Sequence, residues 1–358
     1  MTISLQQLLK AMVEQDASDL HITVGAPPSL RIGGKMVKVK IEPLNAQQCQ
    51  QLAYSVLTDT QKKEFEKNKE LDASFGIKNL ARFRCNMFYQ RGAIAGVFRR
   101  IPFQIPTFDQ LGLPSVINKM IGAANGLILI TGPTGSGKST TLAAILDKIN
   151  REEHSHILTI EDPIEFVHAH KNSIVNQREV GSDTGSFSNA LKRLLRQDPD
   201  VVLVGEMRDL ETIEMALTIA ETGHLVFGTL HTNSTVQTIN RIINVFPADQ
   251  QSQIRQLVSF VLQGIVAQNL VPKSYEPGRT LVQEVLVPTP GIRNLIREEK
   301  VHQIYSAMQI GQDQTGMITM NQSLLNLVKQ GVIKSETAVE YSPNPDEMEK
   351  MLGMKATG

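Results

Sequence analysis

Residues 126–142 read GLILITGPTGSGKSTTL, an apolar run followed by a glycine-rich loop and the start of an amphipathic helix. Within this stretch, residues 132–139 fit the pattern G-x-x-x-x-G-K-[ST] at every fixed position. In such a loop, successive backbone N–H groups can turn towards phosphate oxygens because no Cβ stands in the way. The stretch therefore predicts a strand, a phosphate-binding loop and a helix, the opening of an α/β nucleotide-binding fold.

The side chains of this loop suit a nucleoside triphosphate. Lys138 can reach the β- and γ-phosphates, and the Ser139 hydroxyl is placed to ligate Mg²⁺. Guanine-reading switch GTPases usually carry an N-K-x-D element, whereas residues 118–121 read NKMI and precede the loop, so ATP is favoured. We expect the following residues to bind the nucleotide: Gly132, Pro133, Thr134, Gly135, Ser136, Gly137, Lys138, Ser139 and Thr140.

Length and composition limit the class of protein. The chain has 358 residues, 41% of them apolar, which suggests about two domains with real cores. Its 36 Lys and Arg balance its 36 Asp and Glu, so nothing indicates non-specific binding of nucleic acid. Two cysteines, Cys49 and Cys85, exclude a disulfide framework and a four-cysteine zinc site. No signal peptide and no apolar run of ~18 residues is visible, so we expect a soluble cytoplasmic protein.

Periodicity on either side of the loop divides the chain into four parts. Residues 1–101 read as a small α+β unit that ends in a hairpin, ARFRCNMFYQRGAIAGVFRR. Residues 102–116 are rich in proline and read as a linker. From 117 to 270, apolar strands alternate with amphipathic helices, which indicates a parallel sheet with both faces covered. Residues 271–358 begin with a short strand pair and continue as helices.

Carboxylates follow two of the expected strands directly. Glu206 follows the strand VVLV, and residues 161–165, EDPIE, follow HILTI. Parallel sheets place functional residues at the carboxyl ends of their strands. We therefore expect Glu206 to activate the attacking water, as the carboxylate of a Walker B-type segment. The alternative is structural: Glu206 would suit the dipole of the next helix, and Asp209 would cap that helix.

Two histidines bracket the expected strand LVFGTL. His231 ends the strand beside Thr229 and Thr232, and we expect it to sense the γ-phosphate. His224 follows the break at Gly223 and can equally be a structural residue. Four further histidines lie in polar segments without a third ligand at a suitable spacing, so no zinc site is predicted there. They are His154, His156, His168 and His170.

Two arginines of the first unit are expected to face each other. If Arg91-Gly92 forms a two-residue turn, Arg84 lies opposite Arg99, and Asn86 lies opposite Val97. Like charges directly opposite on a sheet are unfavourable, which suggests an anion between them. A γ-phosphate bound by a neighbouring subunit is one candidate, because arginine fingers are often supplied in trans. The alternative is a pair of splayed arginines on a solvated face.

Taken together, these segments resemble the ATPases of type II and type IV secretion systems, and most closely the pilus-retraction branch of that family. The resemblance covers nearly the whole chain. It implies a PAS-like α+β N-terminal domain, a RecA-like P-loop ATPase domain with a mostly parallel sheet, and a helical C-terminal extension. The segments that carry it are ARFRCN with VFRRIP, GPTGSGKST, TIEDPIE, DVVLVGEMRD, TGHLVFGTLHT and GIRNLIREEK.

The resemblance also implies roles for individual residues. The family has a glycine where many P-loop ATPases carry a metal-binding aspartate, and Gly205 matches it. Its catalytic glutamate corresponds to Glu206, and its acidic-box carboxylate corresponds to Glu165, which would hold Mg²⁺ directly or through water. Two further pairs complete the implied nucleotide site: the box histidines His224 and His231, and the intersubunit arginines Arg84 and Arg99.

The biological role implied by the resemblance is ATP-driven retraction of type IV pili by a homohexamer. The ring would turn an inner-membrane platform protein (PilC-like) and work at the inner face of the inner membrane, touching the membrane through that partner only. A PilU-like paralogue would be a further partner. The segment GIRNLIREEK would be either an amphipathic packing helix or a contact for a partner.

Other functions stay open from the sequence. A pilus-assembly or type II secretion ATPase (GspE-like) usually has an extra N-terminal domain and four zinc-binding cysteines, neither of which is present. Gly291 replaces the first alanine of the retraction motif A-I-R-N-L-I-R-E, which leaves room for a PilU-like accessory ATPase. A nucleotide-binding regulator without hydrolysis and a RecA-like DNA motor are further alternatives, the second disfavoured by the neutral charge.

Overall fold

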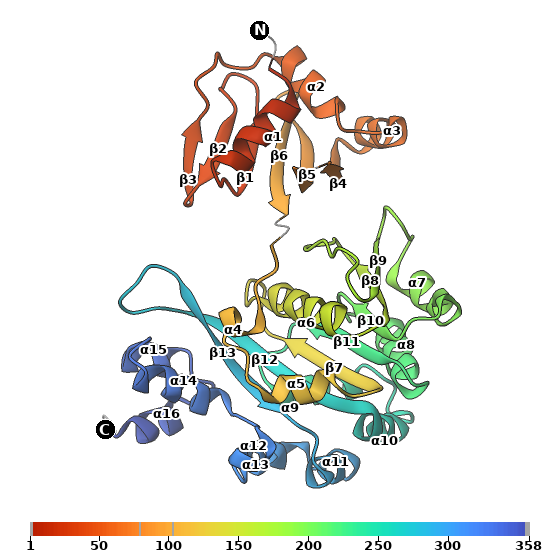
Figure 1. The fold of residues 1–358 in the computed structure, drawn as a ribbon, viewed down its shortest axis with the longest axis vertical. Coiled ribbons are helices and arrows are strands. Elements are labelled where there is room, and N and C mark those ends of the chain that lie inside the picture. Colours follow the sequence, from red (N-terminus) through yellow and green to blue (C-terminus); the bar gives the residue numbers. More distant parts are fainter. Residues whose placement is uncertain (1–2, 79, 102–103, 355–358) are drawn as a thin grey trace. The chain divides into compact units, whose positions relative to one another are not determined.

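The computed structural model describes residues 3–78, 80–101 and 104–354 (Figure 1). Contacts between residues divide the chain into two compact units. The first unit comprises Met1–Gln104 together with Glu165–Val167, and the second comprises Ile105–Ile164 and His168–Gly358. The expected linker starts at residues 102 and 103, which lie outside the described residues, and the remainder from Ile105 onwards groups with the second unit.

The first unit is an antiparallel six-stranded sheet accompanied by three helices. The strand order is β3-β2-β1-β6-β5-β4. The strands are β1 (Asp19–Ile22), β2 (Ser29–Ile32), β3 (Lys35–Lys38), β4 (Glu70–Ile77), β5 (Ala81–Gln90) and β6 (Ala93–Ile101). The helices are α1 (Leu5–Glu14), α2 (Ala46–Tyr54) and α3 (Asp59–Asn68). One apolar core, which includes Leu9, Phe65, Phe83 and Phe98, joins the helices to the sheet.

The β5–β6 hairpin has the predicted register. Arg84 pairs with Arg99, and Asn86 pairs with Val97. The turn residues Arg91 and Gly92 both have positive φ angles, of 51° and 77°. A two-residue turn of type I′ requires this conformation, and it matches the right-handed twist of the two strands. The loop length therefore fixes which side chains face each other across the hairpin.

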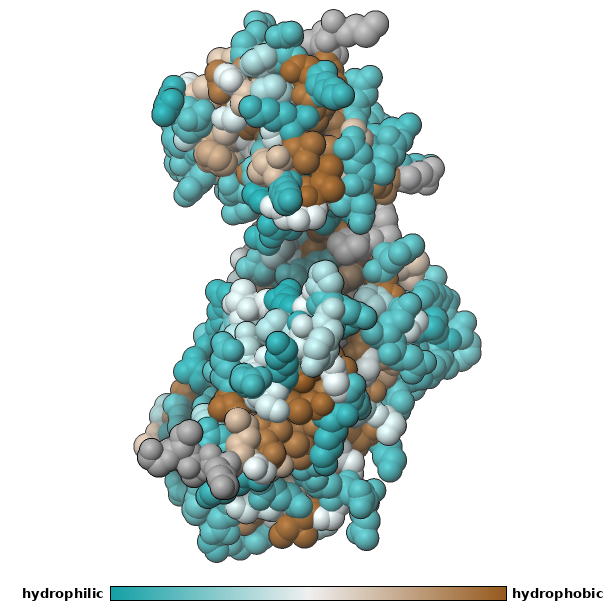
Figure 2. All heavy atoms as spheres, turned by 90° about the vertical axis from the view of Figure 1, so that its left-hand side faces the viewer, coloured by the Kyte–Doolittle hydropathy of each residue, from teal (hydrophilic) through white to brown (hydrophobic). Residues whose placement is uncertain are grey.

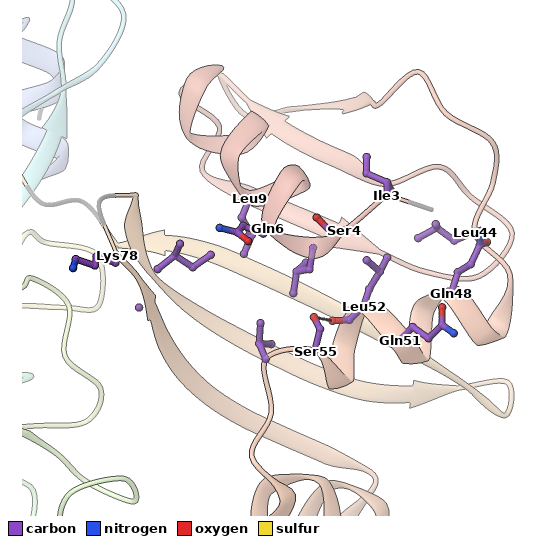
Figure 3. A pocket seen from close by; sticks show the side chains of 14 residues that line it. Ile3, Ser4, Gln6, Leu9, Leu44, Gln48, Gln51, Leu52, Ser55 and Lys78 are labelled. Atoms are coloured by element: carbon purple, nitrogen blue, oxygen red, sulfur yellow. Dashed lines mark hydrogen bonds between the residues drawn. The ribbon is translucent and has the colours of Figure 1, made fainter. Parts of the chain in front are cut away.

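The first unit also contains a pocket of about 680 Å³ (Figure 3). It lies between the start of α1, one face of α2 and the end of β4. Leucines from both helices, such as Leu9 and Leu52, line it, and the amides of Gln6, Gln48 and Gln51 also border it. The two helices thus leave part of their apolar surface open between polar side chains.

The second unit is built on a seven-stranded sheet with the order β13-β12-β7-β11-β10-β8-β9. Six neighbouring strands pair in parallel, and β13 pairs antiparallel with β12. The strands are β7 (Gly126–Thr131), β8 (His156–Glu161), β9 (Ile174–Glu179), β10 (Val201–Val204), β11 (Leu225–Leu230), β12 (Leu262–Pro272) and β13 (Arg279–Leu286).

One difference from the sequence analysis concerns β12. We expected a short strand pair from residue 271 onwards, but β12 already begins at Leu262 and extends the central sheet beside β7. Its sequence, LQGIVAQNLVP, is interrupted by glutamines and asparagine, which hides the apolar pattern of a buried strand. The hairpin β12–β13 therefore belongs to the main sheet rather than to a separate C-terminal element.

Helices cover both faces of this sheet, as predicted. In β7, Leu127 and Leu129 pack in one core with α8 (Leu210–Glu221), α9 (Thr235–Asn244) and α10 (Gln251–Val261). Ile128 and Ile130 pack on the other face with the helices that flank β7 in the chain. These are α5 (Val116–Ile121) and α6 (Lys138–Glu152). Successive residues of a strand point to opposite faces, so the uniformly apolar β7 serves two cores.

The remaining helices are short. They are α4 (Phe108–Leu111), α7 (Phe187–Leu194), η1 (Leu195–Gln197), α11 (Pro290–Arg297), η2 (Val301–Gln303), α12 (Ile304–Met308), α13 (Gln312–Thr315), α14 (Met320–Lys329), α15 (Ser335–Glu340) and α16 (Pro345–Leu352). The last three form a small core with Val271 and Val282 of the β12–β13 hairpin.

Polar side chains cover most of the face shown in Figure 2, and apolar ones appear in separate patches on it. Within the described residues, the large apolar side chains that are more than 70% exposed are Phe260, Tyr275 and Ile310. None of the described helices combines the length and the apolar composition that crossing a membrane would require.

Candidate nucleotide site

The carboxyl ends of neighbouring parallel strands gather the candidate residues at one edge of the second sheet. The last residue of β7, Thr131, pairs with Leu230, the last residue of β11. The chain then continues into Gly132 on one side and His231 on the other, and the Gly132 N–H donates to the Leu230 carbonyl at 3.3 Å. The phosphate loop and His231 therefore start side by side, as the parallel topology predicts.

The loop ends at the amino terminus of α6. Gly137 is the N-cap residue, with a φ angle of 88°, and no side chain caps the helix. Lys138 is the first helical residue, and its Nζ donates to the carbonyls of Gly132 and Pro133 at 2.8 and 3.0 Å. An uncapped helix amino terminus combined with a lysine is strongly favourable for an anion.

These donors fit the polyphosphate of a nucleotide. Backbone N–H groups and the Lys138 ammonium suit phosphate oxygens, and the half-buried Ser139 in the first turn of α6 supplies a hydroxyl ligand for Mg²⁺. No group of three or more His, Cys, Asp or Glu that could hold a metal ion occurs in the part of the chain that the structure describes.

Glu206 lies at the same edge, two residues beyond the end of β10. Its Oε1 accepts hydrogen bonds from His231 Nε2, at 2.9 Å, and from Arg208 Nε. The Glu206 side chain is 17% exposed, whereas that of Arg208 is 76% exposed. The structure thus brings Glu206 and His231 into contact beside the phosphate loop, which sequence spacing alone only suggested.

The two donors determine the charge of Glu206. Burial disfavours its ionised form, but the hydrogen bond and charge of Arg208, with a smaller contribution from His231, outweigh burial and lower the pKa. Glu206 is therefore ionised at neutral pH. A carboxylate with a lowered pKa is a weak base, so the geometry suits orientation and polarisation of a water molecule better than complete removal of its proton.

Gly205 is the residue that brings β10 close to β8. Its N–H donates to the Ile160 carbonyl at 2.8 Å. A Cβ at this position would lie 3.0 Å from the Ile160 oxygen and 3.1 Å from Glu161 Cα, so a larger residue would push the strands apart. This crowding is a physical reason for glycine where many P-loop ATPases carry a carboxylate. The alternative role for Asp209 is confirmed, since its Oδ1 accepts from the Thr212 N–H and caps α8.

His224 does not join the phosphate loop of its own chain. It precedes β11, and its Nδ1 lies 3.1 Å from the Ile219 carbonyl at the end of α8. The six residues of β11, at about 3.3 Å each, separate it from the His231 edge by roughly 20 Å. Its contacts within the chain are those of the structural alternative, and a role for His224 at a nucleotide stays a prediction.

One of the paired arginines of the first unit, Arg99, binds a carboxylate of its own unit. Arg99 Nε donates to Asp19 Oδ1 at 2.8 Å, and Asp19 is buried in the sheet. Burial raises the pKa of Asp19, but hydrogen bonds from Ser18 and Arg99 more than offset this, so the pKa is lowered. Asp19 thus supplies an anion for Arg99, and the predicted anion between Arg84 and Arg99 stays a prediction. A role for either arginine on a neighbour's nucleotide stays a prediction.

Glu165 is exposed and groups with the first unit, whereas Ser139 belongs to the second. The geometry of the β7–β10–β11 edge does not test its predicted contribution to Mg²⁺ binding. The acidic residue next to the end of β8 is instead Glu161, whose Oε1 accepts from Thr159 and Gln177 at 2.6 and 3.0 Å. Glu165 remains a predicted ligand.

Two residues of the β12–β13 hairpin contact the phosphate loop and were missed in the sequence. Gln268 Nε2 donates to the Ser136 carbonyl at 2.8 Å, and Arg279 Nη1 donates to the Gly135 carbonyl at 3.5 Å. Both lie more than 130 residues from the loop in the chain, and neither belongs to a recognisable motif. The only local signal is a glutamine inside the apolar run IVAQNLV.

The sequence model of the type II/IV secretion system protein family matches residues 1–340. The chain belongs to the type II/IV secretion system protein family.

The chain is similar over its whole length to two proteins of Pseudomonas aeruginosa. It is 49% identical to the type IV pilus retraction ATPase PilT, over 96% of this chain and 99% of that protein. It is 42% identical to the type IV pilus ATPase PilU, over 98% of this chain and 91% of that one. A crystal structure of the pilus retraction motor PilT with bound ADP matches with a TM-score of 0.92 and 52% identity, covering 97% and 99% of the two chains. The shared fold confirms the predicted α/β architecture.

Proposed function

We propose that the chain is an ATP-hydrolysing motor that drives retraction of type IV pili. The observation that carries the proposal is the edge where β7, β10 and β11 end, which joins the phosphate loop to the Glu206–His231 pair. Identity of 49% to PilT over almost the full length of both proteins supports the biological role. ATP is cleaved to ADP and phosphate by an attacking water.

The proposed chemistry relies on positioning and charge. Backbone N–H groups of residues 132–140 and Lys138 would hold the phosphates, and Ser139 would help to hold Mg²⁺, which supplies positive charge for the transferred phosphoryl group. Ionised Glu206 would orient the attacking water. His231 donates to Glu206 at the edge that carries the phosphate loop, so a contact between His231 and the γ-phosphate would link the nucleotide to the carboxylate.

We further propose that a ring of six subunits completes the site. Arg84 and Arg99 of one subunit would stabilise the γ-phosphate bound by its neighbour, and Glu165 would contact Mg²⁺ directly or through water. Because Asp19 already pairs with Arg99, Arg84 would make the first contact and Arg99 would exchange partners. Residues 1–101 would form the PAS-like domain, 102–116 the linker, 117–270 the ATPase core and 271–358 the C-terminal region.

The proposed partners are those of a pilus machine. The ring would act on a PilC-like platform protein at the cytoplasmic face of the inner membrane, with a PilU-like paralogue as a further partner. An accessory, PilU-like role is the second candidate function, because the chain is also 42% identical to PilU. Nucleic acid is not a proposed partner.

Deletion of the gene in its native host separates these functions. A retraction motor predicts long surface pili and loss of twitching motility, both restored by the wild-type gene and not by Lys138→Ala. An assembly ATPase predicts cells without pili, which would contradict the proposal. An accessory role predicts residual retraction under low load.

Mixed rings test the trans role of the arginines. Rings of Arg84→Ala chains and rings of Lys138→Ala chains are each expected to be inactive, whereas mixed rings should regain part of the ATP turnover. Mass measurement of the mixed rings verifies that both chains are present. Inactive mixed rings of confirmed composition would contradict the trans role.

A further inference from the structure

Two buried glutamines lie behind the phosphate loop, on the β12–β13 hairpin. Gln268 of β12 and Gln283 of β13 are directly opposite in the antiparallel register. Residues in this relation place their side chains on the same face of the sheet, within reach of each other. Gln268 is 1% exposed and Gln283 is 4% exposed. Both amides are thus core residues of the second unit.

Each amide donates to a backbone carbonyl outside the sheet. Gln268 Nε2 donates to Ser136 in the phosphate loop at 2.8 Å. Gln283 Nε2 donates to Gly112 at 3.3 Å, and Gly112 ends α4 in the segment that leads into the ATPase core. The pair therefore contacts the loop on one side and the preceding segment on the other.

Stability alone does not explain these two residues. Neither Gln268 Oε1 nor Gln283 Oε1 has a hydrogen-bond donor within residues 3–78, 80–101 and 104–354. A buried acceptor without a donor is destabilising, and this cost offsets part of what the hydrogen bonds to Ser136 and Gly112 contribute. The two amides thus donate to Ser136 and Gly112 although each of them buries an acceptor that is unpaired among the described residues, which lowers the stability of the fold.

The bond from Gln268 fixes the orientation of one peptide in the loop. The Ser136 carbonyl and the Gly137 N–H belong to the same trans peptide and point in opposite directions. Holding the carbonyl towards β12 therefore turns the Gly137 N–H away from β12, as a phosphate donor requires. The approach is close, since a Cβ on Gly132 would lie 2.2 Å from the Gln268 carbonyl oxygen, and one on Gly137 would lie 3.3 Å from Gln268 Nε2.

We propose that Gln268 is a positioning residue for nucleotide binding: it holds the Ser136–Gly137 peptide ready for phosphate, while Gln283, opposite it on the same face of the sheet, holds the segment at Gly112. The inference rests on the proposed function, because it takes Mg·ATP as the ligand of this loop. Gln268 acts through the backbone of the loop and need not touch the nucleotide. Displacing either amide should weaken the hold on that peptide.

Replacing Gln268 by methionine tests the proposal. Gln268→Met keeps the length of the side chain and removes both polar groups. In the full-length assembled protein, the dissociation constant of a fluorescent ATP analogue with Mg²⁺ should rise on the order of tenfold, the effect of one hydrogen bond. The midpoint of thermal unfolding without nucleotide should stay close to that of the wild type, because the unpaired Gln268 Oε1 is removed while the Ser136 carbonyl loses its donor.

The same strand supplies a matched control. Gln263 Nε2 also donates to a backbone carbonyl, that of Asn125 at 3.0 Å, but at the other end of β12. Gln263→Met should leave nucleotide affinity within twofold of the wild type. If Gln268→Met fails to assemble, Gln268→Leu provides a second apolar replacement with the same expected loss of affinity.

The link to Gly112 is tested by combining variants. Gln283→Met should weaken nucleotide binding about threefold, and the double variant should bind no more weakly than Gln268→Met alone, since coupled residues are not additive. A folded Gln268→Met protein that binds Mg·ATP as tightly as the wild type would overturn the inference and leave the proposed function intact. A wild-type protein that binds no ATP would instead overturn the proposed function.

Discussion

Each unit contains an exposed arginine that holds a more buried carboxylate at the end of a strand. In the first unit, Arg99 is 68% exposed and pairs with Asp19, which is 6% exposed. In the second, Arg208 is 76% exposed and pairs with Glu206, which is 17% exposed. In both pairs the hydrogen bonds overcome burial and lower the pKa of the acid.

The two pairs differ in what surrounds them. The further donor to Asp19 is Ser18, and the whole arrangement belongs to a sheet whose neighbouring strands it joins. Glu206 accepts from His231 and stands beside an uncapped helix amino terminus that attracts anions. The ion pair of the first unit thus joins neighbouring strands, whereas that of the second unit lies at the predicted site of hydrolysis. The following predictions separate these two roles.

The largest expected effect on kcat is a difference between variants at the two ends of β11. His231→Ala removes a donor to Glu206 beside the phosphate loop and should lower kcat for ATP on the order of 100-fold. His224→Ala removes a contact with the end of α8 and should change kcat less than threefold. Steady-state phosphate release measures both. Equal losses in the two variants would mean that His224 also acts at a nucleotide, for example one bound by a neighbouring subunit.

A smaller effect is expected from the partner of Glu206. Arg208→Ala removes the hydrogen bond and charge that keep the pKa of Glu206 low, so the pKa should rise. Since Glu206 acts in its ionised form, the acidic limb of the kcat profile should move to higher pH, with kcat at pH 8 reduced less than tenfold. The exposed Arg196→Ala variant serves as the control. An unchanged acidic limb would show that ionised Glu206 does not limit turnover.

Among these three sites, the smallest effect on turnover is expected from replacing Asp19. Asp19→Asn should lower the free energy of unfolding by about 2 kcal/mol at pH 7, because Arg99 loses a charged partner. ATP turnover should remain within twofold of the wild type. Asp16→Asn is the matched control, since Asp16 also pairs with an arginine, Arg100, but is 87% exposed, and such pairs contribute little. A stable Asp19→Asn protein without ATP turnover would contradict the claim that Asp19 affects stability and Glu206 affects turnover.

The pH dependence of the Asp19 contribution has a definite sign. The pKa of Asp19 is lowered in the folded protein, so its stabilisation is fully present above the unfolded value of 3.8. It is lost as the pH falls through the lower, folded pKa. Thermal unfolding of wild type and Asp19→Asn should therefore converge in acid, and a difference that grew below pH 3.8 would contradict the assignment.

The sequence predicts what local patterns determine. The glycine-rich loop, the apolar strand before it and the helix after it appear in the structure where the motif placed them. The two-residue turn at Arg91 and Gly92 sets the register of the β5–β6 hairpin. The Arg84–Arg99 pairing could therefore be predicted by counting residues outward from the turn. Parallel topology was enough to bring His231 and Glu206 to the edge that carries the loop.

Contacts between distant segments could not be predicted in the same way. Asp19 meets Arg99 across 80 residues, and Gln268 meets Ser136 across 132. Asp19 and Gln268 belong to no motif, because a single buried polar side chain leaves no periodic signal. His224 shares a box with His231 in the sequence, yet β11 carries the two to opposite ends of one strand. Sequence proximity within a motif is thus a poor guide to proximity at a site.

The most direct test of the proposed site is ATP turnover by Glu206→Gln, measured together with nucleotide affinity. The variant keeps the size of the side chain and an acceptor for His231 but removes the charge. We predict that kcat falls at least on the order of 100-fold, while the dissociation constant for Mg·ATP and the oligomeric state stay as in the wild type. A Glu206→Gln ring that hydrolyses ATP at the wild-type rate would contradict the assignment of this edge as the site of hydrolysis.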